Sequence, residues 1–200
     1  PLVLIAPYDA PFGSVAELIE AARKAPGKIT YGSAGNGGSA HLAAATLATR
    51  SSVQMLHVPF RGNGPAMTNM LAGEISFMFY PSIGVAANVE QKRIKALAVG
   101  STRPLAAFPG VPTMDESGFP GFEKTAPWVG MLAPAKTPAA VVDKLNAAMV
   151  QALQDPQVQQ QLQTLGAITV GDTPQAFRSF LTDDKQRWAE VIAAAGIANE

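Results

Sequence analysis

The sequence contains no cysteine among its 200 residues and no excess of charge of either sign. Without cysteine there are no disulfides, thiolate zinc sites or cysteine nucleophiles. Fifteen basic side chains balance fifteen acidic ones. Because there is no long basic run, we expect neither nucleic acid nor an anionic membrane as a partner. The longest apolar runs are shorter than the roughly 18 residues that a transmembrane helix requires.

The chain also lacks an initiator Met and a visible signal peptide. It begins with Pro1-Leu-Val-Leu-Ile-Ala6, which is typical of an interior β-strand. We therefore expect the natural protein to begin earlier. The apolar share is 48%, which is enough for a sizeable core.

The first half alternates between strand and helix patterns. Ser14 and Glu17 are spaced as a capping box at the start of the first helix. Short apolar strands separated by helices favour a mostly parallel sheet that is covered on both faces. The expected strands are 2–6, 29–31, 53–58, 75–80 and 94–99, and the expected helices are 15–24, 39–50, 66–71 and 83–91.

The pattern changes after residue 100. Residues 103–126 are rich in proline and glycine and predict a long irregular connection. The rest is mostly helical, and two strands are too few for a sheet, so we expect this half to complete a domain that begins outside the chain. The expected strands are 128–133 and 167–170, and the expected helices are 139–153 with Thr137 as N-cap, 157–165 after Asp155 and closed by Gly166, and a final helix from Thr173-Pro174 to about 195.

The most informative segment is the loop that follows residues 29–31. Four glycines, Gly32, Gly35, Gly37 and Gly38, precede a helix that begins near Ser39. Helix N-termini bind anions through N–H groups that have no helical partner, and glycine lets the backbone approach a ligand closely. The loop has no Lys, Arg or Asp, so an anion would be bound by N–H and hydroxyl donors alone.

Nucleotide-binding motifs fit this loop poorly. No Gly-Lys-Ser/Thr sequence closes it, so it is not a P-loop. In the dinucleotide fingerprint the third glycine would fall at Ala40, and no acidic residue follows at about 20 residues. A carboxylate is therefore a better candidate ligand than a nucleotide. A purely structural strand-to-helix turn is the alternative.

Along almost its whole length the chain resembles the substrate-binding receptors of tripartite tricarboxylate transporters, also called Bug receptors. The segments that carry the resemblance are Ser14-Val-Ala-Glu-Leu-Ile19, Pro26-Gly-Lys-Ile-Thr-Tyr-Gly-Ser-Ala-Gly-Asn-Gly37, His57-Val-Pro-Phe-Arg-Gly-Asn-Gly-Pro-Ala66, Ile94-Lys-Ala-Leu-Ala-Val99, Pro109-Gly-Val-Pro-Thr113, Trp128-Val-Gly, Leu132-Ala-Pro134 and Ala194-Ala-Gly-Ile197. Each segment is modest alone. Their order and spacing make the resemblance specific.

The resemblance implies an α/β fold of the type II periplasmic-binding-protein kind, with two lobes of mixed or parallel sheets flanked by helices. Residues 7–98 would form one ligand-binding lobe, and residues 1–6 with 99–200 would form the later part of the other, incomplete lobe and the crossover strands. It further implies a monomeric periplasmic receptor that closes like a Venus flytrap on a small carboxylate and delivers it to membrane permease subunits. No enzymatic activity, cofactor, metal or nucleic acid is expected.

The resemblance also places the glycine-rich loop in the ligand site. Ser33 and Ser39 would donate through their hydroxyls, and residues 34–38 through backbone N–H groups. The residues expected to bind ligand in this loop are Ser33, Ala34, Gly35, Asn36, Gly37, Gly38 and Ser39.

Five further residues are weaker candidates for the ligand site. His41 is a candidate contact, although such a residue is more often at the edge of a cleft. Arg61 could pair with a carboxylate, and relatives often carry Lys there, but solvated surface charge is the alternative. Tyr80 and Pro81 end a buried strand, and many relatives have Asp at position 80, so its absence argues against an amino-acid ligand. Trp128 is a candidate cleft wall or a core residue.

Two other functions compete with the receptor. A hydrolytic enzyme would need a base near Ser33 or Ser39, and the sequence has no Gly-x-Ser-x-Gly nucleophile elbow. An effector-binding domain of a transcription regulator can use the same two-lobed architecture. An upstream helix-turn-helix would identify a regulator, and a signal peptide would support the receptor.

Overall fold

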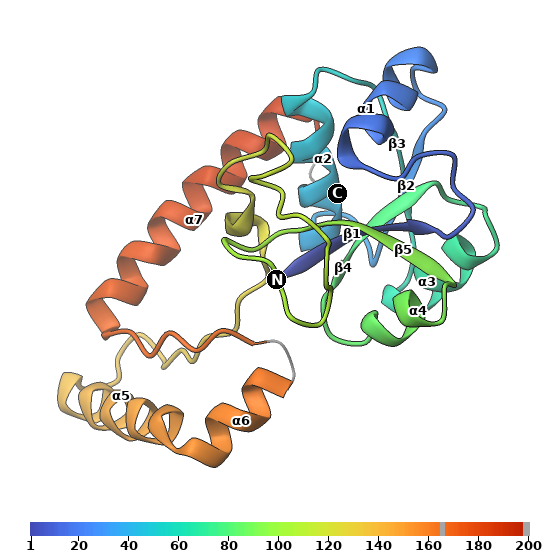
Figure 1. Ribbon diagram of the computed structural model, residues 1–200. Coiled ribbons are helices and arrows are strands. Elements are labelled where there is room, and N and C mark those ends of the chain that lie inside the picture. Colours follow the sequence, from blue (N-terminus) through green and yellow to red (C-terminus); the bar gives the residue numbers. More distant parts are fainter. Residues whose placement is uncertain (165–166, 198–200) are drawn as a thin grey trace. The chain divides into compact units, whose positions relative to one another are not determined.

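The computed structural model describes residues 1–164 and 167–197, which divide into two units (Figure 1). The first unit comprises Pro1–Pro127 and the C-terminal residues from Val191 onward, and the second comprises Trp128–Glu190. This boundary differs from the expected lobe boundary at 98, and the division into lobes stays a prediction. No helix among the described residues is both long and apolar enough to cross a membrane.

The first unit is built on a five-stranded sheet with the order β3-β2-β4-β1-β5. β2 pairs in parallel with β3 and β4, whereas β1 is antiparallel to β4 and β5. The sheet is therefore mixed, as the expected fold class allows: β2, β3, β4 and β5 run in one direction, and β1 runs against both its neighbours. The strands are β1 (Leu2–Pro7), β2 (Thr30–Ser33), β3 (Leu56–Pro59), β4 (Phe77–Pro81) and β5 (Ile94–Val99).

Helices cover both faces of this sheet (Figure 1). The helices are α1 (Val15–Lys24), α2 (Ser39–Arg50), α3 (Asn63–Leu71) and α4 (Ala86–Glu90). One core cluster joins α1 and α2 to Leu2 and Leu4 of β1, and the other joins α3 to Val3 and Ile5. Successive strand residues point to opposite faces, so β1 is fully buried and supplies both clusters.

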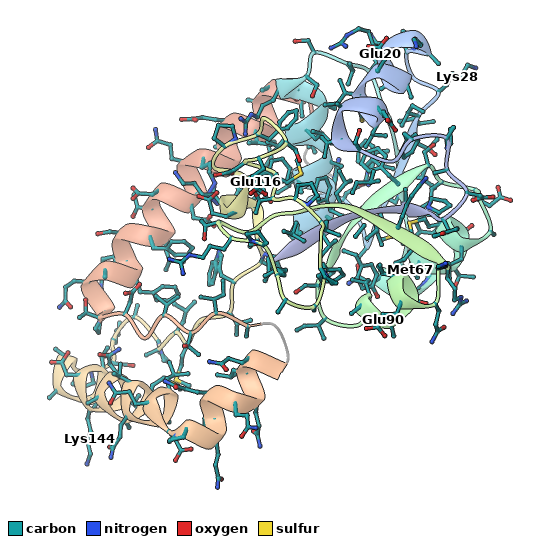
Figure 2. All side chains as sticks on the ribbon, viewed as in Figure 1. Glu20, Lys28, Met67, Glu90, Glu116 and Lys144 are labelled. Carbon is teal, nitrogen blue, oxygen red and sulfur yellow. The ribbon has the colours of Figure 1, made fainter. Side chains whose placement is uncertain are left out.

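Charged side chains lie on the outer surfaces of this unit. Glu20 of α1 and Glu90 of α4 project away from the sheet (Figure 2). The predicted capping box forms at the start of α1: Ser14 Oγ accepts from the Glu17 N–H at 3.2 Å, and Glu17 accepts from the Gly13 N–H at 2.6 Å. The first bond satisfies a donor that the helix leaves without a partner, and the second ties the residue before the N-cap to the first turn, which explains why α1 begins where the sequence predicts.

The starts of two elements differ from the prediction, and in each case the local backbone explains the difference. β3 begins at Leu56, not at residue 53, because the Val53 N–H still bonds to the Ala48 carbonyl and Ser52 has a φ of 53°. α3 begins at Asn63, three residues earlier than predicted, because Gly62 takes a φ of 112° and serves as its N-cap. Glycine is the residue that adopts such a backbone without strain.

The second unit contains α5 (Ala139–Gln154), α6 (Pro156–Thr164) and most of α7 (Pro174–Ala194). Asp155 and Thr173 cap α6 and α7 through side-chain oxygens, as predicted. α5 is preceded by Pro138 as its N-cap, so the Thr137 cap was wrong. The expected end of α6 at Leu165 and Gly166 lies outside the described residues.

The two strands predicted in the second unit do not form among the described residues. Residues 128–133 and 167–170 have no ladder hydrogen bonds, although they include apolar side chains that are largely exposed. A strand needs a partner for its backbone donors and acceptors, and the described part of this unit offers none. The apolar pattern alone was therefore insufficient to predict a strand in either segment. The exposed residues are Val129, Met131, Leu132, Ile168 and Val170.

A tight contact at β2 gives a stability prediction. A Cβ added at Gly32 would lie 2.3 Å from Cδ1 of the buried Ile75. We expect Gly32→Ala to lower the free energy of unfolding by about 1–3 kcal/mol through overpacking. Ile75→Val removes that methyl group, so in urea unfolding the double variant should be more stable than the sum of the two single effects predicts. Additive effects would contradict this origin of the strain.

Candidate ligand site at the glycine-rich loop

Three parallel strands end at the same edge of the sheet, where open α/β sheets bind ligands. β2 and β3 are in register from Thr30↔Leu56 to Ser33↔Pro59. The pairing continues into the loops, because the Phe60 N–H donates to the Ser33 carbonyl at 2.9 Å and the Gly62 N–H to the Ala34 carbonyl at 3.3 Å. The glycine-rich loop, residues 33–39, is therefore hydrogen-bonded through its backbone to the loop that contains Arg61.

The glycine-rich loop presents mainly backbone at this edge. Gly35 has a φ of 142° and Gly37 a φ of 69°, and both conformations favour glycine. α2 begins at Ser39 after Gly38, which caps it without a side-chain hydrogen bond. The exposed residues of the loop are Ala34, Asn36, Gly37 and Gly38. The first N–H groups of a helix have no acceptor in a preceding turn, so a helix start such as this one can receive an anion.

Ser33 occupies an interior position rather than the loop surface. Its side chain is fully buried. Its Oγ donates to the Gly35 carbonyl at 2.9 Å, accepts from the Gly35 N–H at 3.2 Å and lies 2.7 Å from Nε2 of His57. These bonds fix the shape of the loop. The prediction that Ser33 touches the ligand stays a prediction, and Ser39 is the more accessible of the two hydroxyls.

Two histidines stack beneath the loop. The rings of His41 in α2 and His57 in β3 lie 3.6 Å apart between centroids, with 12° between their planes. Tyr31 of β2 packs against them, its ring centroid 5.0 Å from that of His57. His41 is 5% exposed, and its Nδ1 accepts from the Gly37 N–H at 3.1 Å. His41 therefore supports the loop from below.

His57 was not among the residues predicted to bind ligand. The available signal was the period of two along the strands: His57 is opposite Tyr31, and Ser33 lies two residues after Tyr31 on the same face. The stack could not be predicted because it also requires the position of α2 relative to the sheet.

Burial keeps both imidazoles neutral. Desolvation lowers the pKa of His41, and desolvation together with repulsion from His41 lowers the pKa of His57 to about 4. Burial also raises the pKa of Tyr31 to about 12. A neutral His41 is required by its hydrogen bond, because only a deprotonated Nδ1 can accept from an N–H.

A cavity of about 270 Å³ opens beside this stack, within the first unit. Both histidines and Tyr31 contribute to its wall, and the C-terminal segment after α7 supplies the remaining apolar side. The lining residues are Tyr31, Asn36, His41, Ala45, Met55, His57, Ala195 and Ile197.

The remaining predicted site residues fall in two places. Arg61 is exposed in the loop fastened to the glycine-rich loop, and it makes no ion pair with any described residue. Tyr80 and Pro81 are half-buried at the end of β4, at the same edge. Trp128 belongs to the second unit, where its Nε1–H donates to Asp184 at 3.1 Å and its ring meets Phe177 edge to face.

The pairing of Ser33 with His57 resembles a nucleophile and its base, but its geometry suits support rather than catalysis. The Ser33 Oγ is inaccessible and already bonded to both the N–H and the carbonyl of Gly35. A nucleophile must reach its substrate, and its base is normally oriented by a third group. In the described ranges no carboxylate bonds to either histidine. Within those ranges no cluster of three or more His, Cys, Asp or Glu residues could hold a metal ion.

The lowered pKa of the half-buried His57 predicts a pH-dependent stability. In the unfolded chain His57 titrates near 6.5, whereas its folded pKa is about 4, so below pH 6.5 the unfolded state binds more protons. The free energy of unfolding should therefore fall as the pH drops from 6.5 towards 4. Chemical unfolding at several pH values tests this, with His57→Gln as the variant expected to lose part of the slope. An equal slope in both proteins would exclude His57 as its source.

Comparison with known proteins finds a family match along almost the whole chain. The sequence profile described as "Tripartite tricarboxylate transporter family receptor" matches residues 1–197. A protein encoded in the tcbD–tcbE intergenic region of Pseudomonas sp. strain P51 is 40% identical over 193 residues, which cover 96% of this chain and 57% of that protein. The chain thus spans little more than half the length of this relative.

Solved structures show the same fold. An R. palustris structure with adipate has a TM-score of 0.86 at 30% identity, covering 99% of this chain and 66% of that one. The periplasmic binding protein BugD gives 0.80 at 32%, covering 100% and 67%. The MatC protein of Rhodopseudomonas palustris with bound malate gives 0.79 at 27%, covering 96% and 66%. By fold and by sequence over residues 1–197, the chain belongs to the tripartite tricarboxylate transporter receptor family.

Proposed function

We propose that this chain is the larger part of an extracytoplasmic solute-binding receptor for a small organic acid, most simply a dicarboxylate. The observation that carries the proposal is the glycine-rich loop at the shared end of β2, β3 and β4, which offers N–H donors without a charged side chain of its own. Relatives of the same fold have been solved with adipate and with malate, which differ in length but share two carboxylates.

One carboxylate of the ligand would lie on the N–H groups at the start of α2, with Ser39 as a hydroxyl donor. Arg61, in the neighbouring loop that is hydrogen-bonded to the glycine-rich loop, would meet ligand charge that the glycine-rich loop does not neutralise. Arginine can bind a carboxylate with two parallel hydrogen bonds. Tyr80 and Pro81 would close the same edge, and ordered water would complete the contacts.

Family membership supports a proposal for the wider role. Residues 7–98 would form one lobe and residues 99–200 part of the other, with Trp128 on the second lobe's side of the ligand cleft. The lobes would close around the ligand as a hinge. We propose a monomer in the periplasm that presents its closed form to the permease subunits of the transporter, without catalysis, cofactor or metal.

A thermal-shift screen of the protein at its natural length tests the proposal. The panel contains adipate, malate, succinate and citrate, with amino acids and sugars as uncharged or zwitterionic comparisons. A ligand present at 100 times its Kd should stabilise the protein by about 2.7 kcal/mol. Stabilisation by carboxylates alone is the expected result. Stabilisation by sugars or amino acids, or by nothing in the panel, would contradict the proposed ligand class.

A further inference from the structure

The polar groups beneath the glycine-rich loop form a continuous chain of contacts. Gly37 donates to His41, His41 stacks on His57, and His57 meets Ser33, which holds Gly35 on both its N–H and its carbonyl. Ser33, Gly35 and Gly37 are thus each part of this series of contacts or hydrogen-bonded to a member of it. The conformation of the proposed ligand loop therefore depends on two imidazole rings.

From this arrangement we propose that His41 is a positioning residue whose protonation releases Gly37 and weakens ligand binding. The proposal rests on the proposed function of the loop. It follows from the direction of one hydrogen bond: the Gly37 N–H points at His41 Nδ1 over 3.1 Å, and a proton on Nδ1 would place two donors face to face. Either the ring must rotate or Gly37 must move.

Three features oppose a charge at His41 and make its protonation costly in the present loop conformation. The ring is almost fully buried, it lies near the positive end of the α2 dipole, and its face is covered by a second imidazole at 3.6 Å. A conformation that exposes His41 to water would relieve all three. Acidification should therefore favour an altered loop.

The groups around the stack add no compensating charge. Tyr31 of β2 is the other titratable side chain in contact with both rings, and burial raises its pKa to about 12, so it stays neutral. The other described residues of the cavity wall, from the loop, α2, the segment before β3 and the C-terminal segment, are uncharged. No described carboxylate bonds to either ring.

The chain offers well-matched variants. His41→Asn places an amide oxygen near the position of Nδ1, so it can accept from the Gly37 N–H at every pH. His57→Gln removes the second titratable ring and leaves His41 in place. Because these are the two histidines of the sequence, the variants separate the contributions of each imidazole.

The first arm needs no ligand. The amide resonance of Gly37 is followed by NMR from pH 8 to the onset of acid unfolding, together with the ring protons of His41. We expect the Gly37 amide to shift with the midpoint of His41 in the natural protein and in His57→Gln, and to stay constant in His41→Asn. A Gly37 amide that stays constant in the natural protein overturns the proposal.

The second arm measures the Kd of adipate across the same pH range. Below the pKa of His41, the Kd of the natural protein should rise by up to about tenfold per pH unit relative to the Kd of His41→Asn. Adipate itself titrates in the same range, but its titration affects both proteins equally and cancels in this ratio. Parallel curves, or tighter relative binding at low pH, overturn the proposal. If neither protein binds adipate at pH 7.5, the proposed ligand class fails, while the first arm still decides the role of His41.

Discussion

Gly35→Val should raise the Kd for the ligand by about 100-fold or more while the protein still folds. Gly35 has a φ of 142°, where a β-branched residue is strained by about 1–3 kcal/mol. The strain would be relieved by moving the loop, which breaks the two bonds between Gly35 and Ser33 and misplaces the N–H donors. Losing two hydrogen bonds to a charged ligand, at about 1.5–3 kcal/mol each, accounts for a change of that size.

Gly73→Val is the matched control for this substitution. Gly73 has a φ of 78° and lies between α3 and β4, at the other end of the sheet, where an added Cβ would meet nothing within 4 Å. It should therefore lower stability through the same backbone strain and leave the Kd unchanged. Calorimetric titration of both variants with the ligand found in the screen makes the comparison. An unchanged Kd in Gly35→Val would contradict the assignment of the loop.

Ser33→Ala should reduce both stability and affinity. The substitution removes the hydroxyl that accepts from the Gly35 N–H and leaves Nε2 of the half-buried His57 without its 2.7 Å contact. Leaving a buried polar group unsatisfied costs about 1–3 kcal/mol in the free energy of unfolding. Because the loop also loses its internal support, we expect the Kd to rise by about tenfold.

Ser39→Ala distinguishes a residue that binds the ligand directly from one, such as Ser33, that supports the conformation of the loop. Ser39 is partly exposed at the first position of α2 and is not its N-cap, which is Gly38, so its loss should affect the Kd without a comparable loss of stability. Urea unfolding and calorimetry on the two serine variants give the four values required. If Ser33→Ala lowers affinity without any loss of stability, Ser33 binds the ligand itself and its role as a support is wrong.

The sequence predicted the elements whose boundaries are set by local chemistry. α1 and α2 were placed at the observed residues because a capping box and a glycine-rich entry mark their starts. β1 and β5 were recognised as apolar runs; β1 is fully buried, and β5, at the edge of the sheet, is buried except at Lys95 and Ala96. The direction of β1 was not predictable, because an apolar run is equally suitable for a parallel or an antiparallel neighbour.

The candidate site was only partly predictable for the same reason. The four glycines identified the loop, but whether Ser33 faces the ligand or the interior depends on the register of β2 with β3. His57 is 24 residues from Ser33 and meets it only through that pairing. The segments 128–133 and 167–170 failed as strands because a pattern of apolar residues does not provide a hydrogen-bonding partner.

A crystal structure of the protein at its natural length with adipate is the most direct test of the central claim. We predict a carboxylate oxygen within hydrogen-bond distance of backbone N–H groups between residues 34 and 40, with Ser33 still bonded to Gly35 and His57. Adipate bound elsewhere, or held by side chains while the glycine-rich loop stays unoccupied, would contradict the account.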